Sequence, residues 1–183
     1  MTAWLKKGAI NVETVARFEK VSLNEYLKAN GVNEDTEQTI IDGLTQEWND
    51  ITLPTRATEG SAGFDFYAPY DIVYAKDVKP TIKITTGIRC YIEPGWFLML
   101  VPRSGLGCKV GMRLKNTVGI VDADYYIADN EGHIMAFIEA DEDFYLEEGD
   151  RFMQGIFVPY GLAENCEPLK VKREGGFGST GGN

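Results

Sequence analysis

Residues 81–102 read TIKITTGIRCYIEPGWFLMLVP, and this stretch decides the fold class. It is rich in β-branched and aromatic residues, and Glu93-Pro94-Gly95 divides it as a turn would. Similar segments follow at residues 133–140 (HIMAFIEA) and 149–160 (GDRFMQGIFVPY). Short strands at such close spacing predict a mainly β chain, folded as a barrel or sandwich of the jelly-roll kind.

The first fifty residues have a different character. Residues 16–21 (ARFEKV) predict a short strand. Ser22 followed by Glu25 has the spacing of a capping box, which marks the start of a helix. Between residues 37 and 48, apolar side chains recur at steps of three and four, as on one face of a helix. We therefore expect a strand followed by a helical excursion over residues 22–48.

Composition excludes several classes of protein. The chain has 183 residues, of which 28 are acidic and 18 basic, so its net charge is −10 and binding to nucleic acid is disfavoured. No apolar run approaches the length of a membrane span. Cys90, Cys108 and Cys166 have no metal-binding spacing and predict reduced thiols in a cytoplasmic protein of a bacterial or phage-infected cell. His133 is the single histidine, which argues against most histidine-based zinc sites and Ser-His-Asp triads.

Five segments combine glycine, charge and hydroxyl groups in unusual density. They are AGFDFYA (62–68), PRSGLG (102–107), NTVGIVDADY (116–125), GDRFMQ (149–154) and REGGFGSTGG (173–182).

Each segment has a chemical and a purely structural interpretation. In PRSGLG, a guanidinium, a hydroxyl and glycine amides can hold phosphate, or Arg103 can form a structural salt bridge at a strand-ending turn. Asp122 follows an apolar strand and can take a proton from water, or it simply starts a turn. Asp65 supports a site or stabilises a β-turn. Alternation along the strand puts Arg151 and Gln154 on opposite faces, so that they need not share a role.

The order and spacing of these segments resemble the five motifs of the homotrimeric dUTP pyrophosphatases (dUTPases), over about residues 53–182. The resemblance implies hydrolysis of dUTP to dUMP and pyrophosphate, with Asp122 activating the attacking water. It implies Mg2+ on the phosphates, with Asp65 as an indirect ligand through water. The residues that it implies for substrate binding are Arg103, Ser104, Gly105, Asn116, Gly119, Ile120, Val121, Tyr125, Met135, Arg151, Gln154, Arg173, Phe177, Gly178, Ser179 and Thr180.

The resemblance also implies a division of the chain and an assembly. Residues 1–52 would be an N-terminal extension, 53–172 the β-barrel domain, and 173–183 a flexible glycine-rich arm. In a homotrimer with shared active sites, this arm would cover a site of a neighbouring subunit. Asn116 would read the uracil edge, Tyr125 would lie against the deoxyribose and leave no room for a 2′-hydroxyl, and Phe177 would stack on the base.

The chain departs from the family pattern at three places. Six residues, Tyr126 to Glu131, precede the glycine that usually stands two positions after the tyrosine, which predicts a longer surface loop. The arginine of the tail is displaced, so that either Lys172 or Arg173 reaches the γ-phosphate; a planar guanidinium favours Arg173. Residues 22–48 have no counterpart in the minimal domain and suggest an unknown protein partner or an addition at the edge of the trimer.

Two other functions compete with this interpretation. A dCTP deaminase of the same superfamily needs a glutamate on the strand after the hairpin, and the first carboxylate there, Glu139, lies at its far end. A regulatory binding protein on the dUTPase fold is the second alternative, which the intact Asp122 disfavours.

Overall fold

The computed structural model describes residues 13–165, and within that range the protein is mainly β. The helices are α1 (Leu23–Ala29), α2 (Gln38–Asp50), α3 (Ser104–Val110) and the 3-10 helix η1 (Ala123–Ile127). The strands are β1 (Ala16–Lys20), β2 (Thr55–Arg56), β3 (Phe64–Tyr67), β4 (Ile72–Tyr74), β5 (Ile82–Thr85), β6 (Ile88–Ile92), β7 (Trp96–Pro102), β8 (Arg113–Leu114), β9 (Gly119–Asp122), β10 (Met135–Glu139), β11 (Phe144–Leu146) and β12 (Arg151–Pro159). The mainly β expectation is confirmed, and residues 81–102 form three of these strands in succession.

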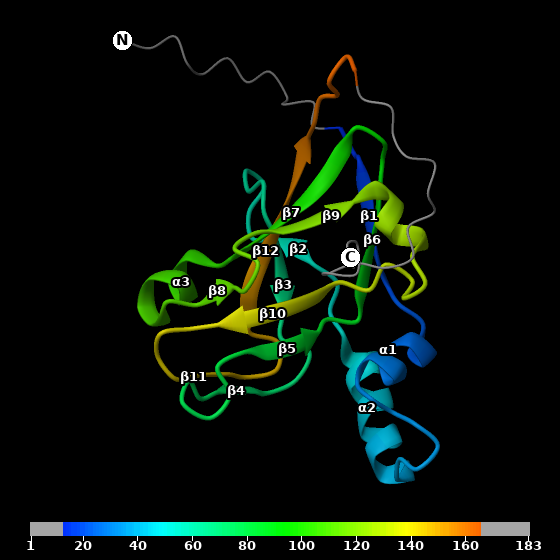
Figure 1. Cartoon of the computed structure of the whole chain (residues 1–183), viewed down its shortest axis with the longest axis vertical. Helices are drawn as coiled ribbons and strands as arrows, with labels where there is room; N and C mark the ends of the chain where they lie inside the picture. Colours follow the sequence, from blue (N-terminus) through cyan, green and yellow to red (C-terminus); the bar gives the residue numbers. More distant parts are fainter. Residues whose placement is uncertain (1–12, 166–183) are drawn as a thin grey trace.

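The strands form antiparallel sheets (Figure 1). The largest has the order β2-β3-β12-β7-β9, with the long strand β12 at its centre. A second sheet has the order β5-β10-β8, and β1-β6 and β11-β4 form two further pairs. Because β3, β7 and β12 are neighbours, segments that lie far apart in the chain, such as Phe64 and Gly155, meet in one sheet.

The core lies under one face of the largest sheet, where side chains alternate as a half-buried strand requires. Leu98 and Leu100 of β7 point into the core and are at most 1% exposed. The intervening side chains point the other way and remain partly exposed. Together with their cross-strand neighbours they form an outer apolar face, made of Phe97, Met99, Val101, Ile120, Ile156 and Val158.

The N-terminal excursion packs against the β core instead of standing apart from it. Strand β1 pairs with β6, and the Ser22 hydroxyl accepts a hydrogen bond from the Glu25 N–H at 3.1 Å, so that it caps α1. Tyr26 of α1 is fully buried. Helix α2 is anchored near its end, where the Trp48 indole donates to the Val21 carbonyl at 2.9 Å. Both helices project from one end of the molecule (Figure 1).

Two local expectations were wrong. The PRSGLG segment is not a turn: after Arg103 the chain forms the seven-residue helix α3. The uracil-reading segment, residues 116–125, was expected to be a hairpin, but it does not consist of two paired strands, because β8 pairs with β10 while β9 pairs with β7. A tight turn links β8 to β9, with Thr117 in the left-handed region at φ 69°.

Candidate active site

Asp65 brings three of the five segments together. Its side chain on β3 is 8% exposed and faces two arginines. One carboxylate oxygen lies 3.2 Å from Arg103 Nε, at the end of β7, and the other lies 3.3 Å from Arg151 Nη1, on β12. The Asp65 carboxylate pairs with both guanidiniums, each of which carries five N–H donors, and so it orients both. Because two guanidiniums face one carboxylate, the cluster keeps an excess of positive charge.

The register of the largest sheet explains why these residues meet. Gln154 of β12 lies directly opposite Asp65 on one side and Val101 on the other. The Arg103 N–H donates to the Phe152 carbonyl at 3.1 Å, which fixes the exit of β7 beside β12. The cluster therefore sits on three neighbouring strands of a continuous ladder.

A β-bulge corrects the expected alternation along β12. The register shifts between Arg151 and Met153, so that Phe152 and Met153 are both fully buried. The extra residue brings Arg151 to the same carboxylate that Gln154 faces. The expectation that these two residues lie on opposite faces was therefore wrong.

Gly63 is a member of this cluster that sequence reasoning missed. A Cβ at this position would lie 2.5 Å from Gln154 Oε1, so a side chain here would displace the amide. The signal available in the sequence is the small-residue pair Ala62-Gly63 directly before the β3 strand.

Ser104 and Gly105 occupy the first turn of α3, directly after Arg103. Both are exposed. The first N–H groups of an α-helix have no acceptor within the helix, which makes them available to a ligand. The Leu106 and Gly107 N–H groups of α3 donate to the Arg103 carbonyl at 3.1 and 2.9 Å.

Asp122 lies far from this cluster in the same chain. It pairs with Phe97, at the opposite end of β7 from Pro102. These two positions are five residue steps apart along the strand, which corresponds to roughly 17 Å. Directly opposite residues of an antiparallel pair share a face, so Asp122 and Gln154 both lie on the side of the outer apolar face, at its two ends.

The residues around Asp122 differ in what they can offer a ligand. Asn116 is exposed in the turn before β9, and Ile120 is 48% exposed. Val121 is 2% exposed and points into the core. Gly119 faces the core as well, because a Cβ added there would lie 3.0 Å from the Leu100 side chain. Val121 and Gly119 can therefore contact a substrate only through their backbone.

Tyr125 and Met135 flank the long loop of residues 126–131. Tyr125 lies in η1 and is 2% exposed, with its hydroxyl donating to the His133 carbonyl at 2.8 Å. Met135 begins β10 opposite Thr85 and is half-buried.

The loop of residues 126–131 is not a plain surface extension. The Tyr126 hydroxyl donates to Glu19 at 2.7 Å and accepts from Arg89 at 2.6 Å. Arg89 also stacks over the Tyr126 ring at 4.2 Å. Hydrogen bonds from the Tyr126 hydroxyl, Arg17 and Arg89 lower the pKa of Glu19 to about 2. The loop thus makes specific contacts with β1 and β6.

The predicted residues of the tail, Arg173, Phe177, Gly178, Ser179 and Thr180, lie outside the described residues, as do Lys172 and Cys166. Within residues 13–165, no group of three His, Cys, Asp or Glu side chains is arranged to hold a metal ion. No helix in that range is long and apolar enough to cross a membrane.

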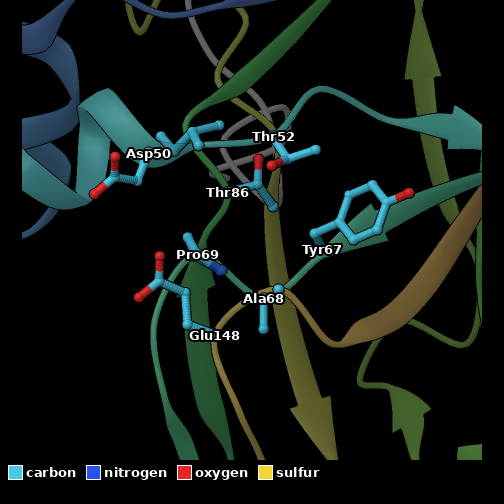
Figure 2. A pocket seen from close by; sticks show the side chains of 9 residues that line it. Asp50, Thr52, Tyr67, Ala68, Pro69, Thr86 and Glu148 are labelled. Atoms are coloured by element: carbon cyan, nitrogen blue, oxygen red, sulfur yellow. The ribbon is translucent and has the colours of Figure 1, made fainter.

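A small pocket of about 90 Å³ opens elsewhere, between the end of α2 and β3 (Figure 2). Its lining includes Asp50, Thr52, Tyr67, Thr86 and Glu148. None of the predicted site residues lines it, so the pocket is separate from the arginine cluster.

The fold and the cluster define a β-rich protein in which two arginines share one buried carboxylate. The dUTPase family model matches residues 49–181. The deoxyuridine 5′-triphosphate nucleotidohydrolases of Lactococcus lactis and Haemophilus ducreyi are 40% and 39% identical to the chain. Each alignment covers 72% of this chain, with 89% of the first relative and 88% of the second. The chain belongs to the dUTPase family.

Solved structures agree with this assignment. The crystal structure of dUTPase from Streptococcus mutans superposes with a TM-score of 0.57 at 28% identity, covering 81% of this chain and 98% of that one. The dUTPase from phage phi11 of S. aureus gives a TM-score of 0.53 at 20% identity, with 66% of this chain and 90% of that one covered. The second likeness concerns the fold alone.

Proposed function

We propose that the chain is a dUTP diphosphatase that hydrolyses dUTP to dUMP and pyrophosphate. The observation that carries this function is the family match over residues 49–181, together with relatives at about 40% identity that are named for this reaction. The cluster around Asp65 supplies the chemistry that a triphosphate requires.

The arginine cluster is the proposed phosphate site. Arg103 and Arg151 are held apart by the two oxygens of Asp65, at 3.2 and 3.3 Å, and both remain partly exposed. Guanidiniums can bind phosphate oxygens through charge-assisted hydrogen bonds. Because Asp65 already orients these two, little side-chain entropy is lost when the phosphate binds. Gln154 and the first N–H groups of α3, at Ser104 and Gly105, add neutral donors beside them.

The active site is proposed to be shared between chains of a homotrimer. Asp122 and Arg103 lie at opposite ends of β7 in one chain, too far apart to act on one phosphate chain. The outer apolar face between them is unusually rich in large apolar side chains for a surface, which supports its burial against other copies. Packing around a threefold axis would bring the Asp122 end of one face toward the Arg103 end of the next.

Asp122 is the proposed general base. A carboxylate at a strand end can take a proton from the water that attacks the α-phosphorus, while the bond to the pyrophosphate oxygen breaks. The arginines of the facing chain then stabilise the charge that develops on the leaving pyrophosphate.

Uracil and deoxyribose are proposed to lie along β9 and η1. Asn116 and the backbone of residues 119–121 would read the base, with Met135 at its side. The Tyr125 ring, which is 2% exposed, would form the fixed wall behind the sugar, and the bond from its hydroxyl to the His133 carbonyl would hold it there.

The tail completes the proposed site. Arg173, Ser179 and Thr180 would bind the outer phosphates, with Gly178 beside them, and Phe177 would stack on the base. In this division, residues 1–52 are an extension, 53–172 the enzymatic domain and 173–183 the covering arm.

Mg2+ is proposed to enter with the substrate. The described residues form no protein cage for a metal, and Mg2+ commonly keeps its waters and binds mainly through substrate phosphates. Asp65 could reach such an ion only through water, because both of its oxygens face arginines. When bound, the ion would neutralise charge on the phosphate oxygens.

Release of pyrophosphate from dUTP, dTTP, dCTP and UTP, with and without Mg2+, tests the function. We expect dUTP to be strongly preferred. Ammonia release from dCTP would instead indicate the deaminase. That alternative needs a glutamate available for proton transfer, whereas Glu139 is paired with Lys115 at 3.3 Å and accepts a bond from Thr81 at 3.0 Å.

A further inference from the structure

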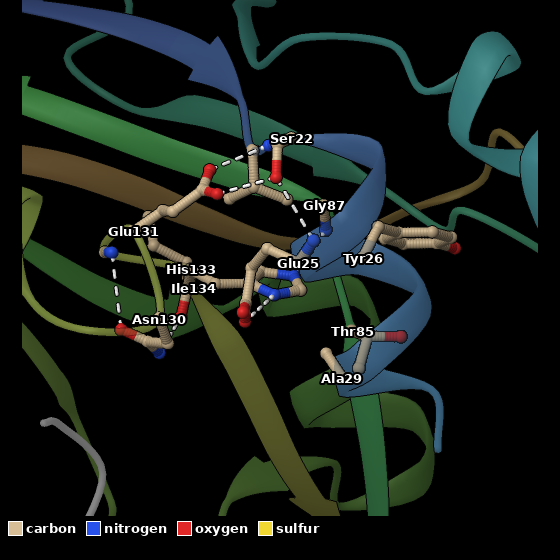
Figure 3. A network of polar contacts seen from close by, with 12 residues as sticks. Ser22, Glu25, Tyr26, Ala29, Thr85, Gly87, Asn130, Glu131, His133 and Ile134 are labelled. Atoms are coloured by element: carbon tan, nitrogen blue, oxygen red, sulfur yellow. Dashed lines mark hydrogen bonds and ion pairs between the residues drawn. The ribbon is translucent and has the colours of Figure 1, made fainter. Parts of the chain in front are cut away.

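Two of the three departures of this chain from the family pattern, the long loop and the N-terminal excursion, contact each other. Glu131, at the end of the long loop, accepts hydrogen bonds from the Ser22 N–H at 2.8 Å and from the Ser22 hydroxyl at 2.6 Å (Figure 3). Ser22 is the residue that caps α1. The loop of residues 126–131 is therefore bonded to the first turn of the N-terminal excursion.

A second contact joins the same two segments through a buried histidine. His133 is fully buried, and its Nε2 accepts from the Gly87 N–H at 2.9 Å. This bond leaves the ring proton on Nδ1, which faces the Glu25 carboxylate of α1 at 3.4 Å. Glu25 is itself only 5% exposed, so both partners are held away from water.

These contacts converge on Tyr125. Its hydroxyl donates to the His133 carbonyl at 2.8 Å and accepts from the Asn130 amide at 2.7 Å. The loop then returns to its starting point at Gly132, where a Cβ would lie 2.7 Å from the Tyr125 carbonyl oxygen. The tyrosine is thus held at its hydroxyl by Asn130 and His133, and its carbonyl accepts from the Ala128 N–H of the loop at 3.0 Å.

We propose that Asn130, Glu131 and His133, supported by Ser22 and Glu25 of α1, are positioning residues that set the selectivity of the enzyme for deoxyribose over ribose. This set of five residues is the brace. The inference rests on the proposed function, in which the Tyr125 ring lies against the sugar. The Tyr125 ring excludes the extra 2′-hydroxyl of UTP sterically only if the ring cannot move aside. The brace holds the ring in place.

Selectivity is the measurement that separates positioning from mere structure. In Asn130→Ala and Glu131→Ala, we expect the ratio of kcat/KM for dUTP to that for UTP to fall by roughly fivefold or more, the effect of about one hydrogen bond. The change should come mainly from faster UTP hydrolysis, with kcat for dUTP kept within about twofold, because neither side chain touches the reacting atoms.

Two further variants make the test specific. Glu131→Gln keeps an oxygen that can accept from Ser22 and should recover part of the selectivity lost in Glu131→Ala. Glu37→Gln is the matched control: this glutamate precedes α2, is exposed and makes no capping bond, so its ratio should equal that of the wild type. Glu131→Ala already removes both bonds to Ser22, so adding Ser22→Ala should lower the dUTP to UTP ratio no further, although it also removes the α1 cap.

The outcomes are distinct. A wild-type protein that does not hydrolyse dUTP would contradict the proposed function itself. A selective wild type whose folded brace variants keep the same dUTP to UTP ratio would overturn this inference alone. Variants that lose activity equally toward both nucleotides would also overturn it, because they would show a general structural role.

Discussion

At the scale of single residues, the site depends on side chains whose partners fix their orientation or charge. Asp65 holds two arginines at 3.2 and 3.3 Å, and the Gly87 N–H fixes the tautomer of His133. Asp122, at the other end of the outer apolar face, is the carboxylate with the proposed chemical role. Substitutions of Asp122 and His133 are therefore expected to affect catalysis and stability, respectively.

Asp122→Asn should reduce kcat for dUTP while leaving its binding nearly unchanged. The amide keeps the size of the side chain but cannot take the proton, and loss of a general base typically costs about 10²–10⁴-fold in rate. Steady-state kinetics together with titration of a non-hydrolysable dUTP analogue measure the two effects. A loss of less than about tenfold would mean that Asp122 only shapes the turn.

His133 should make stability depend on pH. Burial lowers its pKa from 6.5 to about 4, so the folded state disfavours the charged ring. The stabilisation of the folded state by the neutral ring is fully present above pH 6.5. It is lost as the pH falls toward about 4, by about 3 kcal/mol in all. Burial raises the pKa of Glu25, and this acts in the opposite direction.

The histidine part of that pH dependence can be isolated. His133→Gln keeps an acceptor for the Gly87 N–H but does not titrate. Its free energy of unfolding, measured by urea denaturation between pH 8 and pH 4.5, should fall less steeply than that of the wild type. Parallel curves would show that His133 is not the group responsible.

At the scale of elements, two irregularities do the positioning. The bulge in β12 turns Arg151 toward Asp65, and the closed loop of residues 126–131 fixes η1. The loop closes through left-handed backbone at two successive residues, since Glu131 and Gly132 have φ of 57° and 73°. Helix α2 differs from these elements because its Ile40 residue is 53% exposed. A protein partner that would cover residues 22–48 stays a prediction.

Gly132→Ala should destabilise the protein and loosen Tyr125. The new Cβ would enter a left-handed conformation and lie 2.7 Å from the Tyr125 carbonyl oxygen. Backbone strain of this kind costs about 1–3 kcal/mol. Thermal unfolding measures the loss. Gly149→Ala is the control for the left-handed conformation alone, because φ there is 83° and no atom lies within 4 Å of the added Cβ. An equal loss in both variants would show that the close approach at Gly132 is unimportant.

At the scale of the whole molecule, the separation of Asp122 from the arginine cluster is the decisive feature. They lie at opposite ends of β7, about one strand length apart on one face, so a single chain presents the two halves of the proposed site separately. The outer apolar face connects the halves and offers the surface on which copies could assemble. The assembly is therefore proposed to create the active site.

Mixing two inactive variants tests that proposal. Asp122→Asn and Arg103→Ala, unfolded together and refolded at equal amounts, should regain activity. In a closed trimer, random assortment gives roughly one site in four with both residues intact. Each variant refolded alone is the control. No recovery, with trimers verified by mass, would mean that Asp122 and Arg103 of the same chain act together.

The sequence by itself determined the β class, the capping of α1 at Ser22, and the family to which the five segments belong. These features depend on local periodicity and on residue types at fixed spacing, which neighbouring positions are enough to reveal. Only the tertiary structure decided that Arg103 and Arg151 share Asp65, because a bulge shifts the register of β12. It alone revealed the bond between Ser22 and Glu131, which are 109 positions apart. Contacts of that separation leave no periodic signal in the chain, since they depend on how the strands are ordered in space.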